Sequence, residues 1–143
     1  MGRRKFDKES YKKNDWRGKS TVRDYLNKCR VYSFIPQEDY GADVLAYHSK
    51  VNMFIRHEAE MKNLWLGDWP EAWDTVSIPE GKKRLLDGTK IYFWVIRGDC
   101  KYAWRVDGEH LKEEYIEEVS NTSVANGEKF FRIPTNKCVL VKL

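Results

Sequence analysis

The sequence predicts one α/β domain with a central mixed β-sheet flanked by helices. Three observations support this fold class. The 143 residues suit a single hydrophobic core. Hydrophobic residues make up 41% of the chain, enough to fill that core. The order of apolar patterns reads as a helix, three strands, a second helix and further strands. Residues 1–19 are polar, so we expect them to form an extended basic arm, with the single domain over residues 20–143.

The first half of the chain is expected to form a helix and a meander of strands. Apolar residues recur at helical spacing after a capping Ser or Thr, which predicts a helix over residues 21–30. Residues 63–78 contain three tryptophans among Gly and Pro, a composition typical of a packed loop. Between the helix and this loop, three strands should lie over residues 31–35, 42–47 and 51–61.

The second half of the chain is expected to alternate helices with pairs of strands. Pro79 should begin a helix that ends near Gly88, and residues 90–106 read as a hairpin with a Gly-Asp turn. One apolar stripe predicts an acidic helix over residues 107–119. A turn region and two closing strands should follow, over residues 121–129, 129–133 and 137–143.

Composition argues against several classes of protein. No apolar run approaches the roughly 20 residues that a membrane span needs, and the basic N-terminus lacks the apolar stretch of a signal peptide. We therefore expect a cytoplasmic protein without a membrane partner. The three cysteines are far apart, which argues against a disulfide framework. The histidines lack zinc-site spacing, and His57 falls on the expected core face of its strand, as a buried structural histidine would.

Basic residues are concentrated at the N-terminus. Residues 1–30 contain eleven Lys or Arg and four Asp or Glu, whereas the remainder contains fifteen and eighteen. A basic arm on a nearly neutral body suits a polyanionic partner, because each cation near a phosphate releases a counterion. The alternative is a solvated tail without a partner. The nucleic-acid-binding residues expected in the arm are Arg3, Arg4, Lys5, Lys12, Lys13, Arg17 and Lys19.

The third expected strand carries the most informative polar pattern. Successive side chains of a strand point to opposite faces, so Glu58, Glu60 and Lys62 share one face. If this strand and the preceding one form an antiparallel hairpin, Asp43 comes to lie beside Glu60 and Lys62. Three acid-x-Lys triplets occur in the chain, but only Glu60-Met61-Lys62 lies on such a strand. The alternative is an edge strand whose charged face forms cross-strand ion pairs.

Two carboxylates and an ammonium group suit phosphodiester hydrolysis assisted by Mg²⁺ or Mn²⁺. Such a cation is held by one or two carboxylates, a carbonyl and waters, so the expected ligands are Asp43, Glu60 and the backbone carbonyl of Met61. The metal lowers the pKa of a bound water and neutralises charge on the phosphate. Lys62 would orient that water or stabilise the oxyanion. Glu58 is available for a second ion.

These residues resemble the motif of the PD-(D/E)xK nuclease superfamily, the restriction-endonuclease-like fold that includes Holliday-junction resolvases. Residues 41–46 match the first half of the motif and the Glu-x-Lys triplet ending at Lys62 matches the second, with the acidic residues 17 positions apart. The expected order of helix, three strands, helix and strand also matches the core of that fold. Ala42 stands where the motif has Pro, and the first helix offers only Asp24 where many members have a metal-binding Glu.

The resemblance implies a metal-dependent endonuclease that cleaves DNA, and a homodimer, as many enzymes of this type are. It also implies that the helix after Pro79 lends a basic side chain to the scissile phosphate. The candidates are Lys82, Lys83 and Arg84, for which a solvated helix face is the other interpretation. The rival function is a non-catalytic module that binds nucleic acid or protein, because a fold does not fix function.

Overall fold

This computed structural model describes residues 8–37, 43–121 and 124–143. The α-helix is α1 (Lys8–Lys28), and four 3₁₀ helices are η1 (Glu80–Leu85), η2 (Gly108–His110), η3 (Glu113–Tyr115) and η4 (Thr135–Lys137). The strands are β1 (Tyr32–Phe34), β2 (Val44–His48), β3 (Met53–Lys62), β4 (Thr75–Pro79), β5 (Ile91–Arg97), β6 (Tyr102–Asp107), β7 (Ile116–Asn121), β8 (Val124–Pro134) and β9 (Val139–Lys142).

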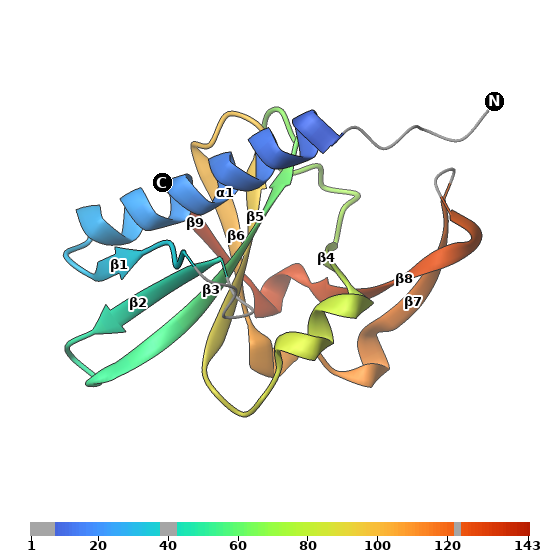
Figure 1. The fold of residues 1–143 in the computed structure, drawn as a ribbon. Coiled ribbons are helices and arrows are strands. Elements are labelled where there is room, and N and C mark those ends of the chain that lie inside the picture. The colour runs from blue at the N-terminus through green and yellow to red at the C-terminus, as the bar shows by residue number, and fades with distance from the viewer. Residues whose placement is uncertain (1–7, 38–42, 122–123) are drawn as a thin grey trace.

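The strands form two sheets within a single small α+β domain (Figure 1). The larger sheet has six strands in the order β1-β2-β3-β5-β6-β9, and the smaller has three in the order β4-β8-β7. Strands β3 and β5 are parallel, whereas the other neighbours in the large sheet are antiparallel. The prediction of a central mixed sheet is therefore confirmed.

Helix α1 runs across one face of the large sheet and includes most of the expected arm (Figure 1). The expectation of an extended arm up to residue 19 is wrong from Lys8 onward, and the boundary at residue 20 falls inside the helix. Gly18 lies against β3, where an added Cβ would come within 3.3 Å of the Ala59 Cβ. Val22 and Leu26 are buried, as their helical spacing predicts. Packing against the sheet thus stabilises a helix that local sequence preference alone leaves marginal.

The meander β1-β2-β3 and the hairpin β5-β6 confirm the strands expected for those segments. His57 on β3 is also buried, as predicted, and its Nδ1 accepts a hydrogen bond of 2.9 Å from Trp94 Nε1. Burial lowers the pKa of His57 to about 3, with smaller contributions from the nearby His48 and Arg105. His57 is therefore a neutral core residue at physiological pH.

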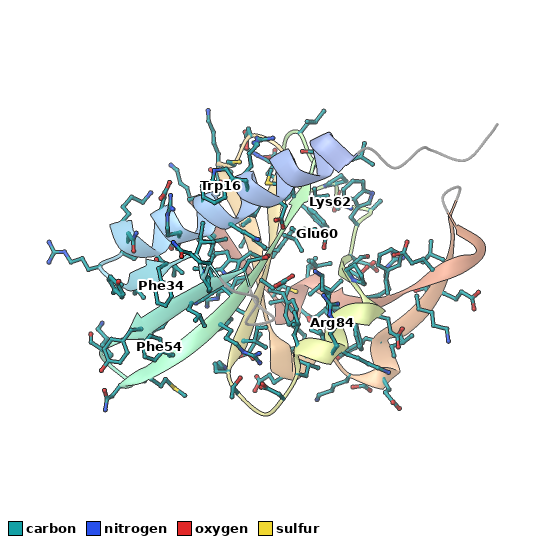
Figure 2. All side chains as sticks on the ribbon, in the orientation of Figure 1. Trp16, Phe34, Phe54, Glu60, Lys62 and Arg84 are labelled. Atoms are coloured by element: carbon teal, nitrogen blue, oxygen red, sulfur yellow. The ribbon has the colours of Figure 1, made fainter. Side chains whose placement is uncertain are left out.

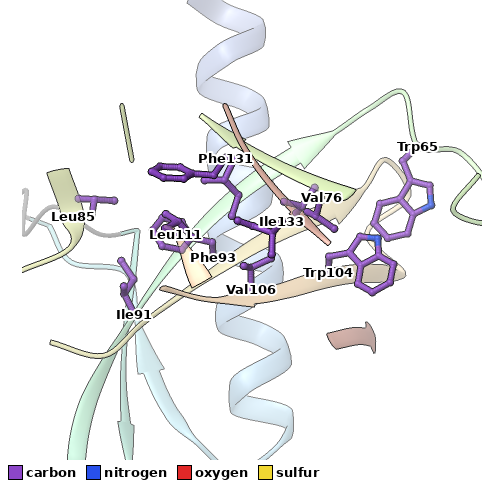
Figure 3. Packing of buried hydrophobic residues seen from close by; sticks show 12 residues of the cluster. Trp65, Val76, Leu85, Ile91, Phe93, Trp104, Val106, Leu111, Phe131 and Ile133 are labelled. Carbon is purple, nitrogen blue, oxygen red and sulfur yellow. The ribbon is translucent and has the colours of Figure 1, made fainter. Parts of the chain in front are cut away.

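The part of the opposite face formed by β5 and β6 is covered mainly by the small sheet. Figure 3 shows the resulting core, in which Phe131 and Ile133 of β8 pack against Phe93 of β5 and Val106 of β6. The helix expected after Pro79 is only the 3₁₀ helix η1. The prediction of a sheet flanked by helices is therefore wrong for this face, because antiparallel pairing of β4 with β8 completes this layer.

The tryptophan-rich segment contains a packed loop followed by a strand that the sequence did not indicate. Trp65 is buried, and Trp69 makes edge-to-face contacts with Trp65, Trp73 and Trp104, at centroid distances of 4.9, 5.0 and 5.7 Å. These contacts confirm the expected packing under a loop. The last residues of the segment form β4, which takes its hydrogen-bonding partner from a distant part of the chain.

The acidic helix expected over residues 107–119 does not form. Asp107 Oδ1 accepts a hydrogen bond from the Glu109 amide and caps the short helix η2, after which η3 leads into β7. Strand β7 pairs with β8 from Ile116 to Asn121. Strand β8 begins at Val124 and takes in most of the expected turn region, and residues 122–123 lie outside the described part of the chain. Ladder hydrogen bonds to β8 override the local helical pattern.

No helix in the described part of the chain is long and apolar enough to cross a membrane.

Candidate functional site

Three acidic residues gather where β3 continues beyond its pairing with β2. Pairing of these strands ends at Val44 and His57, whereas β3 remains paired with β5 as far as Lys62. Here Asp43 Oδ2 accepts a hydrogen bond of 2.9 Å from the Ala59 amide. Glu58 is buried with 8% of its surface exposed, and Glu60 reaches solvent from the same face of β3. We call Asp43, Glu58 and Glu60 the acidic cluster.

The register of the hairpin places Asp43 at the level of Glu58, not beside Glu60 as expected. His48 pairs with Met53, so the turn takes in residues 49–52 and is longer than the sequence suggested. The charge of Glu58 is accordingly the strongest electrostatic influence of another carboxylate on Asp43. In this ladder Glu58 is therefore closer to Asp43 than Glu60 is. The sequence had suggested Glu58 only as the donor for a second ion.

Lys82 of η1 is the cation shared by the whole acidic cluster. Its Nζ lies 2.6 Å from Glu58 Oε1. Burial acts to lower the pKa of Lys82, but the hydrogen bond and charge of Glu58, together with the charges of Glu60 and Asp43, outweigh burial and raise it. Lys82 is therefore held as an ammonium by Glu58, and the charges of Glu60 and Asp43 favour the same form.

Two carboxylates of the acidic cluster hold their protons more tightly than usual. Burial raises the pKa of Asp43 to about 6, the charge of Glu58 adds to this, and the hydrogen bond from Ala59 opposes it. Burial also raises the pKa of Glu60, although Lys82 and Lys62 counteract part of the effect. The side chain of Glu60 is exposed to solvent, but many protein atoms surround its carboxylate and reduce its hydration. Charge is therefore concentrated here at a cost to the folded state.

Lys62 shares the face of Glu60, as predicted, and Figure 2 shows both side chains near the end of β3 on the side of β4. The Lys62 Nζ lies 5.3 Å from the centroid of the Trp73 ring, an arrangement typical of a cation–π contact. Met61 pairs with Ile96 of β5 in the sheet. No sequence spacing indicated this contact between Lys62 and Trp73.

Of the three basic residues on η1, only Lys82 joins the acidic cluster. Lys83 Nζ lies 3.1 Å from Glu80 Oε1 on the same short helix. Arg84 is exposed and donates a hydrogen bond to the carbonyl of Gly81, and Figure 2 shows it on η1. Lys83 and Arg84 thus correspond to the solvated alternative, and Lys82 faces the predicted site.

The basic residues expected in the N-terminal arm do not form one surface, and each group has its own contacts or location. Arg17 donates a hydrogen bond of 2.7 Å to the carbonyl of Gly98. Lys19 Nζ lies 3.0 Å from Asp15 and 3.6 Å from Asp43, so this lysine joins α1 to the acidic cluster. The spacing of Asp15 and Lys19 at i and i+4 could have indicated the first of these ion pairs. Lys12 and Lys13 belong to α1, and Arg3, Arg4 and Lys5 lie outside the described residues.

Comparison with known proteins identified no related protein. No protein-family model matches the chain, and no curated protein or solved structure matches it significantly. Within the described residues, no three His, Cys, Asp or Glu side chains are grouped as a ready-made metal site. The fold and the site define a small α+β protein with a lysine-centred acidic cluster at the end of a sheet strand.

Replacing Asp43 by Asn should stabilise the protein at neutral pH. The folded state holds the proton of Asp43 up to about pH 6, whereas an unfolded chain releases it near pH 4. Wild-type stability is therefore lost as the pH rises through this window, and the variant escapes that loss. We expect a gain of about 1–3 kcal/mol at pH 8, which vanishes below pH 4.

Urea unfolding of both proteins in EDTA, across this pH range, measures the difference. Asp24→Asn is the matched control, since the Asp24 side chain is 67% exposed on α1, and it should change little. An effect of Asp43→Asn that is equal at pH 4 and pH 8 would contradict the assigned pKa.

Proposed function

We propose that this protein is a metal-dependent nuclease that hydrolyses phosphodiester bonds in DNA, with the acidic cluster and Lys62 as its active site. The observation that carries the proposal is the Lys82 ammonium, paired with Glu58 at 2.6 Å and influenced by the charges of Asp43 and Glu60, at the solvent-open end of β3. Perturbed carboxylates near a surface are typical of functional sites, because a protein gains no stability by crowding like charges.

The residues present fit a hydrated divalent cation. Their oxygen donors are those that Mg²⁺ and Mn²⁺ prefer, and Mg²⁺ needs only one or two carboxylates because it keeps several waters. Asp43 and Glu60 would hold the ion, with the backbone carbonyl of Met61, and Glu58 is the donor for a second ion. When bound, the cation lowers the pKa of a water and neutralises charge on the phosphate.

The basic residues around the acidic cluster have separate roles in this proposal. Lys62, held against Trp73, orients the attacking water or stabilises the charge that develops on the phosphate oxygens. Lys82, held by Glu58, attracts the phosphate and keeps it near the carboxylates. The mixture of charges lets a polyanion approach a site that would otherwise repel it.

The order of elements supports the resemblance to the PD-(D/E)xK superfamily up to one point. Helix α1, the meander β1-β2-β3 and then β5 beside β3 follow the helix, three strands and strand of that core. The crossover from β3 to β5 contains β4 and η1 where that core has a helix. Lys82 on η1 nevertheless supplies the basic side chain that the resemblance implies for this crossover.

The rival is a non-catalytic module that binds nucleic acid or protein, and one observation favours it. Two carboxylates of the acidic cluster already have a cation within the chain, Lys82 at 2.6 Å from Glu58 and Lys19 at 3.6 Å from Asp43. A network of this kind also serves as a structural link between α1, β3 and η1.

The decisive experiment is an incubation of the purified protein with linear, circular and branched DNA, in Mg²⁺, in Mn²⁺ and in EDTA. We expect cleavage with either metal and none in EDTA. Protein that leaves every substrate intact in both metals, while binding DNA, would support the non-catalytic module.

Replacing Lys82 by Ala should make folding dependent on a divalent cation. The change leaves the buried Glu58 without its partner, so we expect a loss of about 1–3 kcal/mol of stability in EDTA at pH 8. If the acidic cluster binds Mg²⁺, the ion replaces the missing positive charge and millimolar Mg²⁺ restores much of the loss. Thermal unfolding with and without Mg²⁺ measures both effects.

Lys83→Ala is the matched control, because Lys83 pairs only across the surface of η1 and should cost little. A Lys82→Ala protein that is destabilised but unaffected by Mg²⁺ would identify the acidic cluster as purely structural.

A further inference from the structure

Aromatic side chains gather on the outer part of the meander, on the same face as the acidic cluster. Tyr32 pairs with Tyr47 across β1 and β2, and Tyr47 pairs with Phe54 across β2 and β3. Paired residues share a face of a sheet, and Phe34 lies two residues beyond Tyr32 on β1. Ring centroids are 6.0 Å apart for Tyr32 and Phe34, and 5.3 Å apart for Tyr47 and Phe54. We call these four residues the aromatic face.

The aromatic face is not part of the hydrophobic core. None of its residues belongs to either buried cluster of the described chain. Tyr32 is 68% exposed and Phe54 57% exposed, which is unusual for large rings. Figure 2 shows Phe34 and Phe54 on the β1 and β2 side of the sheet, away from the small sheet that covers β5 and β6. These rings are therefore free to contact a partner.

Cations flank the outer part of the aromatic face, whereas the carboxylates of β3, Glu58 and Glu60, lie further along that strand. Residues 28–37 and 44–57 contain Lys28, Arg30, Lys50 and Arg56 and no Asp or Glu. Arg56 is held by Asp87 at 2.8 Å, but the other three are exposed. Exposed rings among cations suit a polyanion that also carries flat apolar groups.

The aromatic face leads directly to the acidic cluster along β3. Phe54, Glu58 and Glu60 share one face of this strand, and the six residue steps from Phe54 to Glu60 span about 20 Å. A single-stranded nucleic acid of several nucleotides can stack its bases on the aromatic face while its phosphate backbone reaches the acidic cluster. Bases paired within a duplex have no free face for such stacking.

We propose that the aromatic face binds a single-stranded polynucleotide by stacking its unpaired bases on Tyr32 and Phe54. This inference rests on the proposed nuclease function. The substrate class is then single-stranded DNA, or the frayed end of a duplex, that lies along β3 and reaches the acidic cluster. The cationic character favours this partner over a second copy of the chain, which would bring like charges together.

Binding is tested without catalysis, in EDTA, using a fluorescein-labelled 20-mer of deoxythymidine and a 20-base-pair duplex as probes. The double substitution Tyr32→Ala with Phe54→Ala should weaken binding of the single strand about tenfold or more. Binding of the duplex should change much less. The ring-retaining pair Tyr32→Phe with Phe54→Tyr should bind the single strand like the wild type.

The matched control is Val139→Ala with Leu140→Ala, which removes exposed apolar side chains from the opposite edge strand, β9. An equal loss in this control, an unchanged affinity in the alanine pair, or no binding by the wild type would overturn the proposal. So would light scattering that finds a wild-type dimer and a monomeric alanine pair, because the aromatic face would then be a homotypic interface.

The outcome is separable from that of the nuclease proposal. Ring-dependent binding in EDTA by a protein that cleaves nothing in Mg²⁺ would retain the binding surface and reject the catalytic function. Cleavage that survives loss of the rings, with unchanged affinity, would do the reverse.

Discussion

Glu60→Gln should reduce Mg²⁺-dependent cleavage by about a hundredfold or more, the largest effect that the proposed active site predicts. The change removes one carboxylate oxygen donor while keeping the size of a side chain that already reaches solvent. The fold should therefore survive. DNA affinity in EDTA should hold or rise, since a charge that repels phosphate is lost. Lys62→Ala should stop cleavage equally but leave metal binding largely intact, because an ammonium is not a ligand.

Cleavage rates on one DNA substrate, together with affinities in EDTA, separate these effects. Glu117→Gln is the matched control, since this exposed glutamate lies on β7 of the small sheet and should leave the rate unchanged. Normal cleavage by both Glu60→Gln and Lys62→Ala would remove the acidic cluster from the catalytic machinery.

Trp94→Ala should cost about 3–5 kcal/mol of stability, the largest folding effect that we expect. Trp94 is 1% exposed between the large sheet and α1, where Tyr25 meets its ring edge-on at 5.8 Å. The substitution removes this packing and also the indole hydrogen bond to the buried His57. Trp94→Phe keeps one aromatic ring but loses the donor and part of the buried volume, so we expect a smaller loss of about 1–3 kcal/mol.

Urea unfolding of the three proteins measures the effect. Trp16→Ala is the matched control, because Trp16 is 57% exposed on the same helix that covers Trp94 and should change stability little. Equal stability of Trp94→Phe and the wild type would mean that the hydrogen bond to His57 contributes nothing to folding.

Local patterns of apolar and polar residues were sufficient to predict several parts of this protein. Alternation along β3 placed Glu58, Glu60 and Lys62 on one face and His57 in the core, as observed. The hairpin β5-β6 and the buried stripe of α1 were likewise predictable. Each of these features depends on a period of two or 3.6 residues that is set by backbone geometry.

The remaining features depend on contacts between segments that are distant in the sequence. Residues 8–19 became helical because the chain around Gly18 packs on Ala59, and the expected acidic helix became β7 because β8 supplies its hydrogen bonds. The turn at residues 49–52 set Asp43 beside Glu58, and the crossover brought Lys82 to both. These outcomes depend on partners far away in the sequence, whose burial and hydrogen bonds outweigh the weak preferences of a short segment.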